Sequence, residues 1–280
     1  MPTRFADLLF RAIATAGSPA CVGLDPVIEK IPQAVPGGHP ADRLETFSRG
    51  VIDAVRGIVG VVKPQSACFE RYGSLGYAAL ERVVAYARDA GLLVILDAKR
   101  GDIGVTAEHY AAGVQSLGAH AITLSGYMGP SSVEPFLASG LGVFVLVRTS
   151  NPDSDRVQAC QLRDGRTVAG ALADMVLSLG EGRCGESGYS DAGAVVGATK
   201  SHEGQRLRHV LPRHWFLVPG YGAQGGTLAD IRLLLDSKRS GVVVNASRSV
   251  LYASTPPGGC WQDAVAQAAR ALRDDLAALG

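Results

Sequence analysis

Short apolar runs recur along the chain and alternate with longer amphipathic stretches. Each run has the length and continuous apolar character of a buried parallel strand. The eight runs cover residues 20–24, 58–62, 92–96, 119–124, 142–147, 192–197, 215–218 and 241–244. Helical spacing is clear over residues 43–56, 76–90, 105–117, 167–179, 227–235 and 261–279, and weaker over 131–138 and 203–211. An additional N-terminal amphipathic helix is predicted from Phe5, Leu8, Leu9 and Ile13.

The regular alternation of strands and helices predicts the fold class. Strands joined through helices imply right-handed crossovers and a parallel sheet. Eight such units in about 250 residues match an α/β fold of the (β/α)8 (TIM) barrel type. An open doubly wound sheet is the alternative, but it normally carries a glycine fingerprint after its first strand, where this chain has Gly23-Leu24-Asp25-Pro26. Because no linker or compositional break interrupts the pattern, we expect residues 1–280 to form one barrel domain with an extra N-terminal helix.

The carboxyl ends of the predicted strands are rich in polar and charged residues. In a (β/α)8 barrel these ends meet in one mouth, where catalytic groups lie. The polar strand ends comprise Asp25, Lys63, Asp97, Lys99, Ser125, Thr149, Ser150, Thr199, Lys200, residues 220–226 and residues 245–248. The barrel therefore predicts that residues far apart in the sequence form one site.

The third predicted strand ends in the most informative segment, Asp97-Ala-Lys99-Arg-Gly-Asp102. Side chains two apart on a strand share a face, so Asp97 and Lys99 point the same way. Asp102 follows in the loop that opens the next helix. Two carboxylates and an ammonium at the mouth of a buried strand are costly to desolvate if they serve packing alone. A structural ion network is the alternative, and the other polar strand ends favour a catalytic cluster.

Composition narrows the classes of function. Hydrophobic residues make up 47% and charged residues 19%, which is a globular balance with material for a large core. The net charge of +1 provides no basic field for nucleic acid, so any anion must be held by a local site. Five cysteines without a CxxC pair fit a reducing cytoplasm rather than a disulfide framework or a zinc site. Asp7 and Arg11 interrupt the N-terminal apolar stretch, so we expect neither a signal peptide nor a membrane partner.

Several motifs together resemble the signature of the orotidine 5′-phosphate decarboxylase family. They are Leu96-Asp97-Ala-Lys99-Arg-Gly-Asp102-Ile103 with Thr106 one turn later, Gly23-Leu-Asp25, Val62-Lys63-Pro64, Pro219-Gly-Tyr-Gly-Ala-Gln224-Gly-Gly and Asn245-Ala-Ser-Arg248. The resemblance runs from about residue 20 to residue 255 and is nearest to the longer, mycobacterial-like (type 2) branch. The DxKxxD pattern is shared with sugar-phosphate relatives of the same barrel type. DAKRGDI followed in order by PGxGAQGG is much more specific.

The resemblance implies a role for each matching residue. The catalytic group would be an alternating charge array of Lys63, Asp97, Lys99 and Asp102 around the reacting carbon. Asp102, Ile103 and Thr106 would act across the interface of a homodimer. The substrate-binding set would be Asp25, Ile103, Thr106, Ser150, Pro219, Gln224, Gly225, Gly226 and Arg248. Within it, Asp25 and Lys63 would hold ribose hydroxyls, Ser150 the pyrimidine amide, Gln224 both base and phosphate, and Arg248 the phosphate.

The implied reaction is the decarboxylation of orotidine 5′-phosphate to uridine 5′-phosphate, the last step of de novo pyrimidine nucleotide biosynthesis. A fixed positive charge beside C6 in a water-poor site stabilises the carbanion that forms there. Lys99 fits this role and that of proton donor, because flanking carboxylates favour its charged form. The family scheme requires no metal and no organic cofactor. None of the six histidines forms an HxH or HExxH ligand pair.

The glycine-rich segment of residues 220–226 and Arg248 predict the phosphate site. Glycines let the backbone approach an anion, and a following helix N-terminus assists. Arg248 supplies a planar fork of donors, and the resemblance adds backbone N–H groups of Gly225, Gly226 and the Arg248 turn. Many family members have glycine before this arginine, whereas this chain has Ser247. If that position requires a positive φ, serine is strained there.

Two long loops and two single residues complete the predictions for the mouth. Residues 29–42 and 151–166 lie on the predicted active face, and either fits a lid that excludes water. We expect Lys200 to be a solvated loop lysine and His109, in the middle of a helix, to have a packing or surface role.

Three other functions are compatible with parts of the sequence. A sugar-phosphate lyase or decarboxylase would stabilise an enediolate with Mg²⁺, but Ser150 and Gln224 are placed to read a pyrimidine, and loss of activity in EDTA would favour this alternative. A Schiff-base aldolase would need a neutral Lys99, which the adjacent carboxylates oppose. A non-catalytic nucleotide-binding protein on a decayed barrel would be expected to lose the charge array first, yet all four of its members are present.

Overall fold

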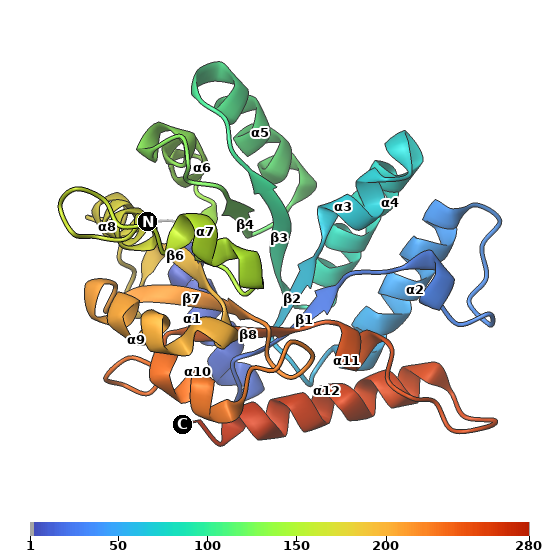
Figure 1. The fold of residues 1–280 in the computed structure, drawn as a ribbon. Helices are drawn as coiled ribbons and strands as arrows, with labels where there is room; N and C mark the ends of the chain where they lie inside the picture. Colours follow the sequence, from blue (N-terminus) through green and yellow to red (C-terminus); the bar gives the residue numbers. More distant parts are fainter. Residues whose placement is uncertain (1–2, 280) are drawn as a thin grey trace.

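The computed structural model describes residues 3–279, and within them eight parallel strands close into a barrel in sequential order (Figure 1). The strands are β1 (Ala20–Leu24), β2 (Val61–Pro64), β3 (Leu93–Arg100), β4 (Ala121–Leu124), β5 (Gly142–Arg148), β6 (Ser190–Val196), β7 (His214–Pro219) and β8 (Val242–Ala246). The ring closes because β1 pairs with both β2 and β8. The (β/α)8 barrel predicted from the apolar pattern is confirmed.

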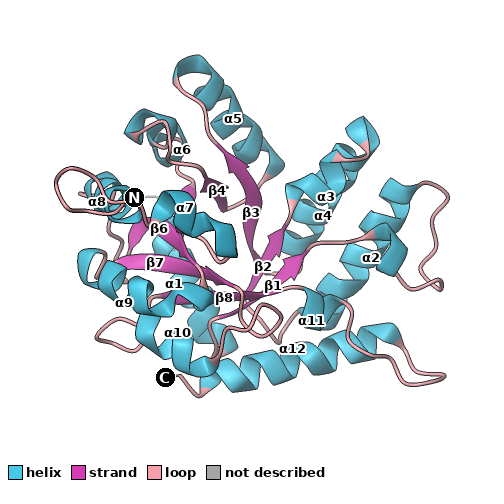
Figure 2. Cartoon of the chain, in the orientation of Figure 1, coloured by secondary structure: helices cyan, strands magenta, loops and turns pink. Residues whose placement is uncertain are grey.

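Helices surround the strands on the outside of the barrel (Figure 2). The longer ones are α1 (Phe5–Ala16), α2 (Pro40–Val55), α4 (Gly73–Asp89), α5 (Gly104–Leu117), α8 (Val168–Leu179), α9 (Ser201–Val210), α10 (Leu228–Leu234) and α12 (Trp261–Ala277). The shorter helices are α3 (Ser66–Glu70), α6 (Glu134–Ala138), α7 (Asp155–Gln158) and α11 (Arg248–Leu251). Single 3-10 turns are η1 (Ile28–Lys30), η2 (Pro130–Ser132), η3 (Pro152–Ser154) and η4 (Ala198–Lys200).

Three strands extend two or more residues further toward the mouth than the apolar runs predict. β2 continues to Pro64, β3 to Arg100 and β8 to Ala246. The added segments contain polar residues, which stay in the sheet because neighbouring strands pair with them. Lys63 pairs with Gly23, Asn245 with Cys21, and Arg100 with Leu124 after a register shift. The continuous apolar run therefore marks the buried part of each strand, and the charged part belongs to the same strand.

Helix α1 closes the amino-terminal end of the barrel. Phe5 and Leu9 join the cluster of buried side chains inside the barrel, where the Phe5 ring meets Phe144 edge-on at 5.9 Å between ring centroids. The buried Asp7 carboxylate accepts hydrogen bonds from the backbone N–H groups of Glu186 (3.2 Å) and Ser187 (2.8 Å). One end of the barrel is thus filled by side chains, and the carboxyl end holds the cavity. None of the helices in residues 3–279 has the length and apolarity needed to span a bilayer.

Candidate active site

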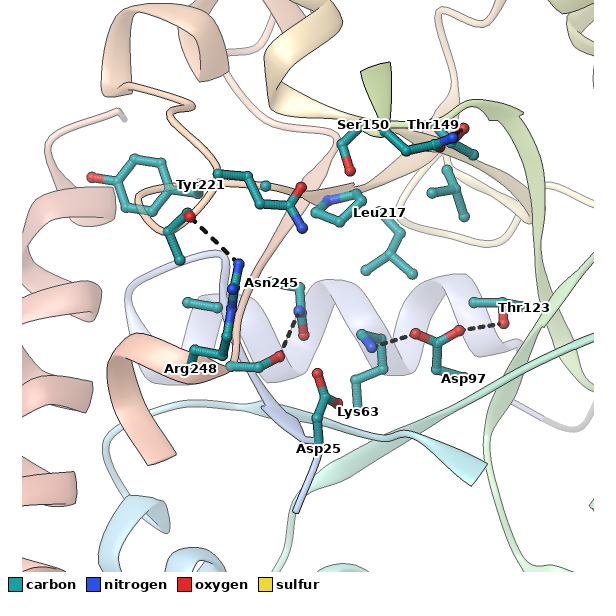
Figure 3. A pocket seen from close by; sticks show the side chains of 18 of the residues that line it. Asp25, Lys63, Asp97, Thr123, Thr149, Ser150, Leu217, Tyr221, Asn245 and Arg248 are labelled. Carbon is teal, nitrogen blue, oxygen red and sulfur yellow. Dashed lines mark hydrogen bonds and ion pairs between the residues drawn. The ribbon is translucent and has the colours of Figure 1, made fainter. Parts of the chain in front are cut away.

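A cavity of about 790 Å³ lies at the carboxyl ends of the strands (Figure 3). The predicted site residues that line it are Asp25, Lys63, Asp97, Lys99, Ser150, Pro219, Gln224 and Arg248. These residues come from the ends of β1, β2, β3, β5 and β7 and from the start of α11, as the barrel predicts. Thr123 of β4 and Asn245 of β8 complete the wall.

Asp97 is the centre of the charge cluster. One carboxylate oxygen, Oδ2, accepts from Lys63 Nζ at 2.5 Å, and the other, Oδ1, accepts from Lys99 Nζ at 2.5 Å and from Thr123 Oγ1 at 2.8 Å. Gln65 Nε2 also donates to Oδ2 at 3.2 Å. Burial alone raises the pKa of Asp97, but the two ammonium groups outweigh burial and hold this pKa well below its usual range. Asp97 is therefore ionised and has its orientation fixed from both sides.

Lys63 lies at the floor of the cavity with only 4% of its surface exposed. Burial lowers the pKa of a lysine, but here the carboxylates of Asp97 and Asp25 outweigh burial and raise it. Oδ1 of Asp25 is buried and has no hydrogen-bond partner among the described residues. An unpaired buried acceptor beside an ammonium is suited to a hydroxyl of a bound ligand.

Lys99 has a left-handed backbone, with φ 47°. This conformation costs a non-glycine residue about 1–3 kcal/mol and persists where the surroundings impose it. Here the surroundings include Thr123, whose hydroxyl oxygen accepts from Lys99 N at 3.0 Å while the hydroxyl donates to Asp97. The Lys99 side chain is 47% exposed, in contrast to Lys63. Its ammonium thus faces the open cavity rather than the floor.

Thr123, Gln65 and Asn245 were not among the residues predicted for the site. A threonine inside an apolar strand carries no signal of its own, because β-branched residues are common in strands. Asn245 belongs to the Asn245-Ala-Ser-Arg248 motif, and its side chain contacts the protein itself: Nδ2 donates to Ser247 Oγ at 3.2 Å.

The glycine-rich loop after β7 lies at the opposite end of the cavity from Asp97, close to Arg248 (Figure 3). Arg248 Nη2 reaches the Ala223 carbonyl at 3.4 Å. The N–H groups of the two glycines predicted to bind phosphate already have acceptors in the loop: Gly225 N donates to Gly222 O at 2.9 Å and Gly226 N to Gly220 O at 3.0 Å. Arg248 thus directs a charged donor at this part of the cavity.

Ser247 adopts φ −118°, so the strain that a positive φ would cause there does not arise. Its hydroxyl lines the cavity beside Arg248. The position that must be glycine is on the neighbouring strand, where a Cβ on Gly23 would lie 2.0 Å from Ser247 Oγ.

Asp102, Ile103 and Thr106 lie outside the cavity of their own chain. Asp102 Oδ1 accepts from Ile103 N at 2.9 Å, and the side chains of this segment face outward, with Ile103 52% and Val105 64% exposed. The structure therefore brings Lys63, Asp97 and Lys99 together, while Asp102 stands apart from them on the rim.

The prediction that Lys200 is a solvated loop lysine is wrong. Its ammonium binds both carboxylate oxygens of Asp155, at 2.7 and 2.9 Å, and its side chain is mostly buried. It does not line the cavity. Among residues 3–279, no group of three or more His, Cys, Asp or Glu side chains is placed to hold a metal ion.

Comparisons with known proteins agree with the motifs. The model of the orotidine 5′-phosphate decarboxylase / HUMPS family matches residues 18–260. An orotidine 5′-phosphate decarboxylase of Rhodopirellula baltica is 39% identical over 298 residues, covering 97% of this chain and 98% of the relative. Another, of Roseiflexus castenholzii, is 41% identical over 274 residues, covering 95% and 96%. The solved OMP decarboxylase of Leishmania donovani superposes with a TM-score of 0.80 at 33% identity, covering 99% of this chain and 98% of that one. This chain is a member of the orotidine 5′-phosphate decarboxylase / HUMPS family.

Proposed function

We propose that the chain converts orotidine 5′-phosphate to uridine 5′-phosphate and carbon dioxide. The observation that carries this proposal is the Asp97 carboxylate held between the ammonium groups of Lys63 and Lys99 at the floor of the cavity. The bond between C6 and its carboxylate breaks, and the electron pair stays on C6. Lys99, the more exposed of the two lysines, stabilises this charge and then transfers a proton to C6.

The positions of the residues that line the cavity support the proposed orientation of the substrate. Arg248 would bind the phosphate at one end, and Asp97 would lie at the other (Figure 3). Lys99, which is hydrogen-bonded to Asp97, would face C6 there. Asp25 and Lys63 would hold ribose hydroxyls, and Oδ1 of Asp25 is an acceptor that still lacks a partner. Ser150, Pro219 and Gln224 would contact the base, and Gln224 would also reach the phosphate. The amides of Gly225 and Gly226 would join only when the loop releases its internal hydrogen bonds.

We also propose a homodimer in which Asp102, Ile103 and Thr106 act in the partner's site. The support is an apolar rim after the adjacent strands β3 and β4, in which large side chains are exposed. Its members are Ile103, Val105, Tyr110, Tyr127 and Met128. Exposed apolar side chains gathered in this way mark interaction surfaces. A second copy would cover the rim and bring Asp102 to the charge cluster.

The proposal also covers the number of domains, the branch of the family and the cellular compartment. We assign residues 1–280 to one domain, because α1 packs against the amino-terminal end of the barrel and α12 packs against α2. The DAKRGDI and PGYGAQGG motifs support the longer, type 2 branch of the family. We place the enzyme in the cytoplasm, where free cysteines stay reduced.

The test is the loss of the orotate absorbance band when purified protein meets orotidine 5′-phosphate in excess EDTA. The proposed charge array needs neither a metal nor an organic cofactor, so turnover should continue in the chelator. Loss of activity in EDTA would favour the metal-dependent sugar-phosphate chemistry. Tight binding of uridine 5′-phosphate without turnover would favour a non-catalytic nucleotide-binding protein.

A further inference from the structure

Arg148, the last residue of β5, is fully buried beneath the rim of the cavity without lining it. Its guanidinium donates to both carboxylate oxygens of Glu203 in α9, Nε to Oε2 at 2.6 Å and Nη2 to Oε1 at 2.9 Å. Nη1 donates to Ser154 Oγ at 2.8 Å. The guanidinium also forms an ion pair with Asp155. A buried arginine with two carboxylates at a strand end is a costly arrangement for packing alone.

The partners of Arg148 connect the short helix α7 to the rest of the barrel. Asp155 and Gln158 are the first and last residues of α7, and Gln158 Oε1 accepts from Arg148 Nη1 at 3.3 Å. Lys200 binds Asp155 from η4. The helix therefore cannot move independently of β5 and α9 without breaking several charge-assisted hydrogen bonds.

Gln158 connects α7 to the wall of the cavity through hydrogen bonds to Thr149. Its Oε1 accepts from the Thr149 backbone N–H at 2.8 Å, and its Nε2 donates to Thr149 Oγ1 at 2.9 Å. Thr149 directly precedes Ser150, the residue proposed to contact the pyrimidine. Gln158 and Ser150 both line the cavity.

Ser150 is held from its other side as well. Its carbonyl accepts from Thr199 Oγ1 at 3.0 Å. A Cβ on Gly197 would lie 2.7 Å from Ser150 Cα, so the segments that follow β5 and β6 can approach this closely only because Gly197 has no side chain. The position of Ser150 is thus defined by contacts on both flanks, of which the Gln158 contact is the one connected to Arg148.

We propose that Arg148 and Gln158 are positioning residues for recognition of the pyrimidine: they hold the backbone of Thr149 so that Ser150 faces the base. This inference rests on the proposed function. It concerns only the part of the cavity that meets the base, since the phosphate would lie at Arg248, at the start of α11. Loss of the Gln158 contact should therefore weaken ligands that carry a base and spare ligands that carry only ribose and phosphate.

The decisive variant is Gln158→Leu, which removes the amide without leaving a buried charge. Inhibition constants would be measured for uridine 5′-phosphate and for ribose 5-phosphate. Because a hydrogen bond contributes about 1 kcal/mol, we expect about a fivefold weaker inhibition by uridine 5′-phosphate. Inhibition by ribose 5-phosphate should be unchanged. Gln161→Leu is the matched control, because Gln161 is an exposed glutamine just after the same helix, and it should change neither constant.

Arg148→Lys tests whether the hydrogen bonds of Arg148 to Glu203 and Gln158 hold Gln158 in place. Lysine keeps the charge but cannot bind Glu203 through two donors and reach Gln158 as well, so the same base-selective loss is expected. If Arg148→Lys does not fold, Gln158→Leu still decides. Equal weakening of both ligands in Gln158→Leu would mean a general structural role and would overturn the inference.

Ser150→Ala separates this inference from the proposed function. If Ser150→Ala shows the base-selective loss and Gln158→Leu does not, the positioning role is wrong while the Ser150 contact stands. If neither shows it, the Ser150 contact fails and the inference fails with it. If only Gln158→Leu shows it, Gln158 acts other than through Ser150, and both statements are overturned. In the double variant we expect little further loss beyond Ser150→Ala, since the two residues would act through one contact.

Discussion

Gly23 on β1 and Ser247 after β8 share one small space. A Cβ on Gly23 would lie 2.0 Å from Ser247 Oγ and 3.0 Å from Asn245 Oδ1. The Ser247 hydroxyl is in turn held by the Asn245 amide. The Ser247 side chain therefore fits only because the residue opposite it on β1, Gly23, has no side chain.

Gly23→Ala should displace Ser247 and with it the start of α11, where Arg248 lies. Overpacking of this kind costs about 1–3 kcal/mol, so we expect a lower Tm and an increase in KM of about tenfold. Ser247→Gly in the same chain should restore most of both, since it removes the atom that clashes. Ser247→Gly alone is the control and should have a small effect. If the double variant is no better than Gly23→Ala, the clash lies elsewhere.

Lys99→Ala should remove measurable turnover and leave the fold intact. Its ammonium is both the proposed charge at C6 and the proton donor, while its side chain is half exposed and contributes little packing. Lys99→Gly separates chemistry from backbone strain, because glycine adopts the observed φ of 47° without penalty. We expect both variants to be inactive and Lys99→Gly to be more stable than Lys99→Ala by about 1 kcal/mol in chemical denaturation. A kcat near that of the wild type in either would refute the assigned role.

Thr123→Val keeps the shape of the side chain and removes its hydroxyl. That hydroxyl joins Asp97 Oδ1 to the backbone of Lys99, so its loss should loosen the charge cluster. We expect kcat to fall by about tenfold, which corresponds to about 1.4 kcal/mol. KM should change little, because Thr123 lies near the reacting end and far from Arg248. A change confined to KM would show that Thr123 serves binding instead.

The barrel could be predicted from the sequence because alternation is a repeated signal. Eight apolar runs separated by helical spacing leave few topologies, and the order β1 to β8 follows from right-handed crossovers. The short helix α3 was not predicted, because residues 66–70 contain no pair of apolar residues at helical spacing. The ends of β2 and β3 were placed too early, because charged residues such as Lys63 and Asp97 do not look like strand residues when read by hydropathy.

The site could be predicted only as far as residue type reveals chemistry. Asp97, Lys99 and Lys63 carry charge at strand ends, and the structure brings them together. Thr123 was missed because a threonine inside an apolar strand carries no signal, and because its contacts with Asp97 and Lys99 depend on the register between β3 and β4. The hydrogen bonds that already occupy the amide of Gly225 likewise depend on the three-dimensional loop and have no signature in the sequence.

We expect the protein to lose stability in mild acid because of the buried His214. Burial lowers its pKa to about 4, with Arg208 and Arg213 adding to the effect, and neither ring nitrogen has a partner among the described residues. The unfolded chain then binds more protons than the folded one between pH 4 and pH 6.5, so the free energy of unfolding falls as pH decreases through this range. From pH 7 to pH 5 the loss due to His214 should be about 2 kcal/mol.

The measurement is urea denaturation across this pH range for the wild type and for His214→Gln, which does not titrate. His214→Gln should have a flatter dependence between pH 7 and pH 5. His209→Gln is the control for the substitution itself, since it makes the same change at an exposed histidine. A slope equal to that of the wild type in His214→Gln would assign the acid sensitivity to other groups.

Lys99 and Asp102 should belong to one site but to two chains. They are separated in each chain, with Lys99 in the cavity and Asp102 outside it, among exposed apolar residues such as Ile103. Lys99→Ala and Asp102→Ala homodimers should each be almost inactive. After the two are mixed and exchange subunits, a hybrid has one site that contains both intact residues. Random pairing in a twofold-symmetric dimer makes half of the molecules hybrid, so activity should recover to about one quarter of the wild-type value.

Mixing Lys99→Ala with a Lys99→Ala/Asp102→Ala double variant is the control and should recover nothing. If the first mixture also stays inactive while subunit exchange is verified by mass, Asp102 serves the site of its own chain, and the rim after β3 must move to bring it there.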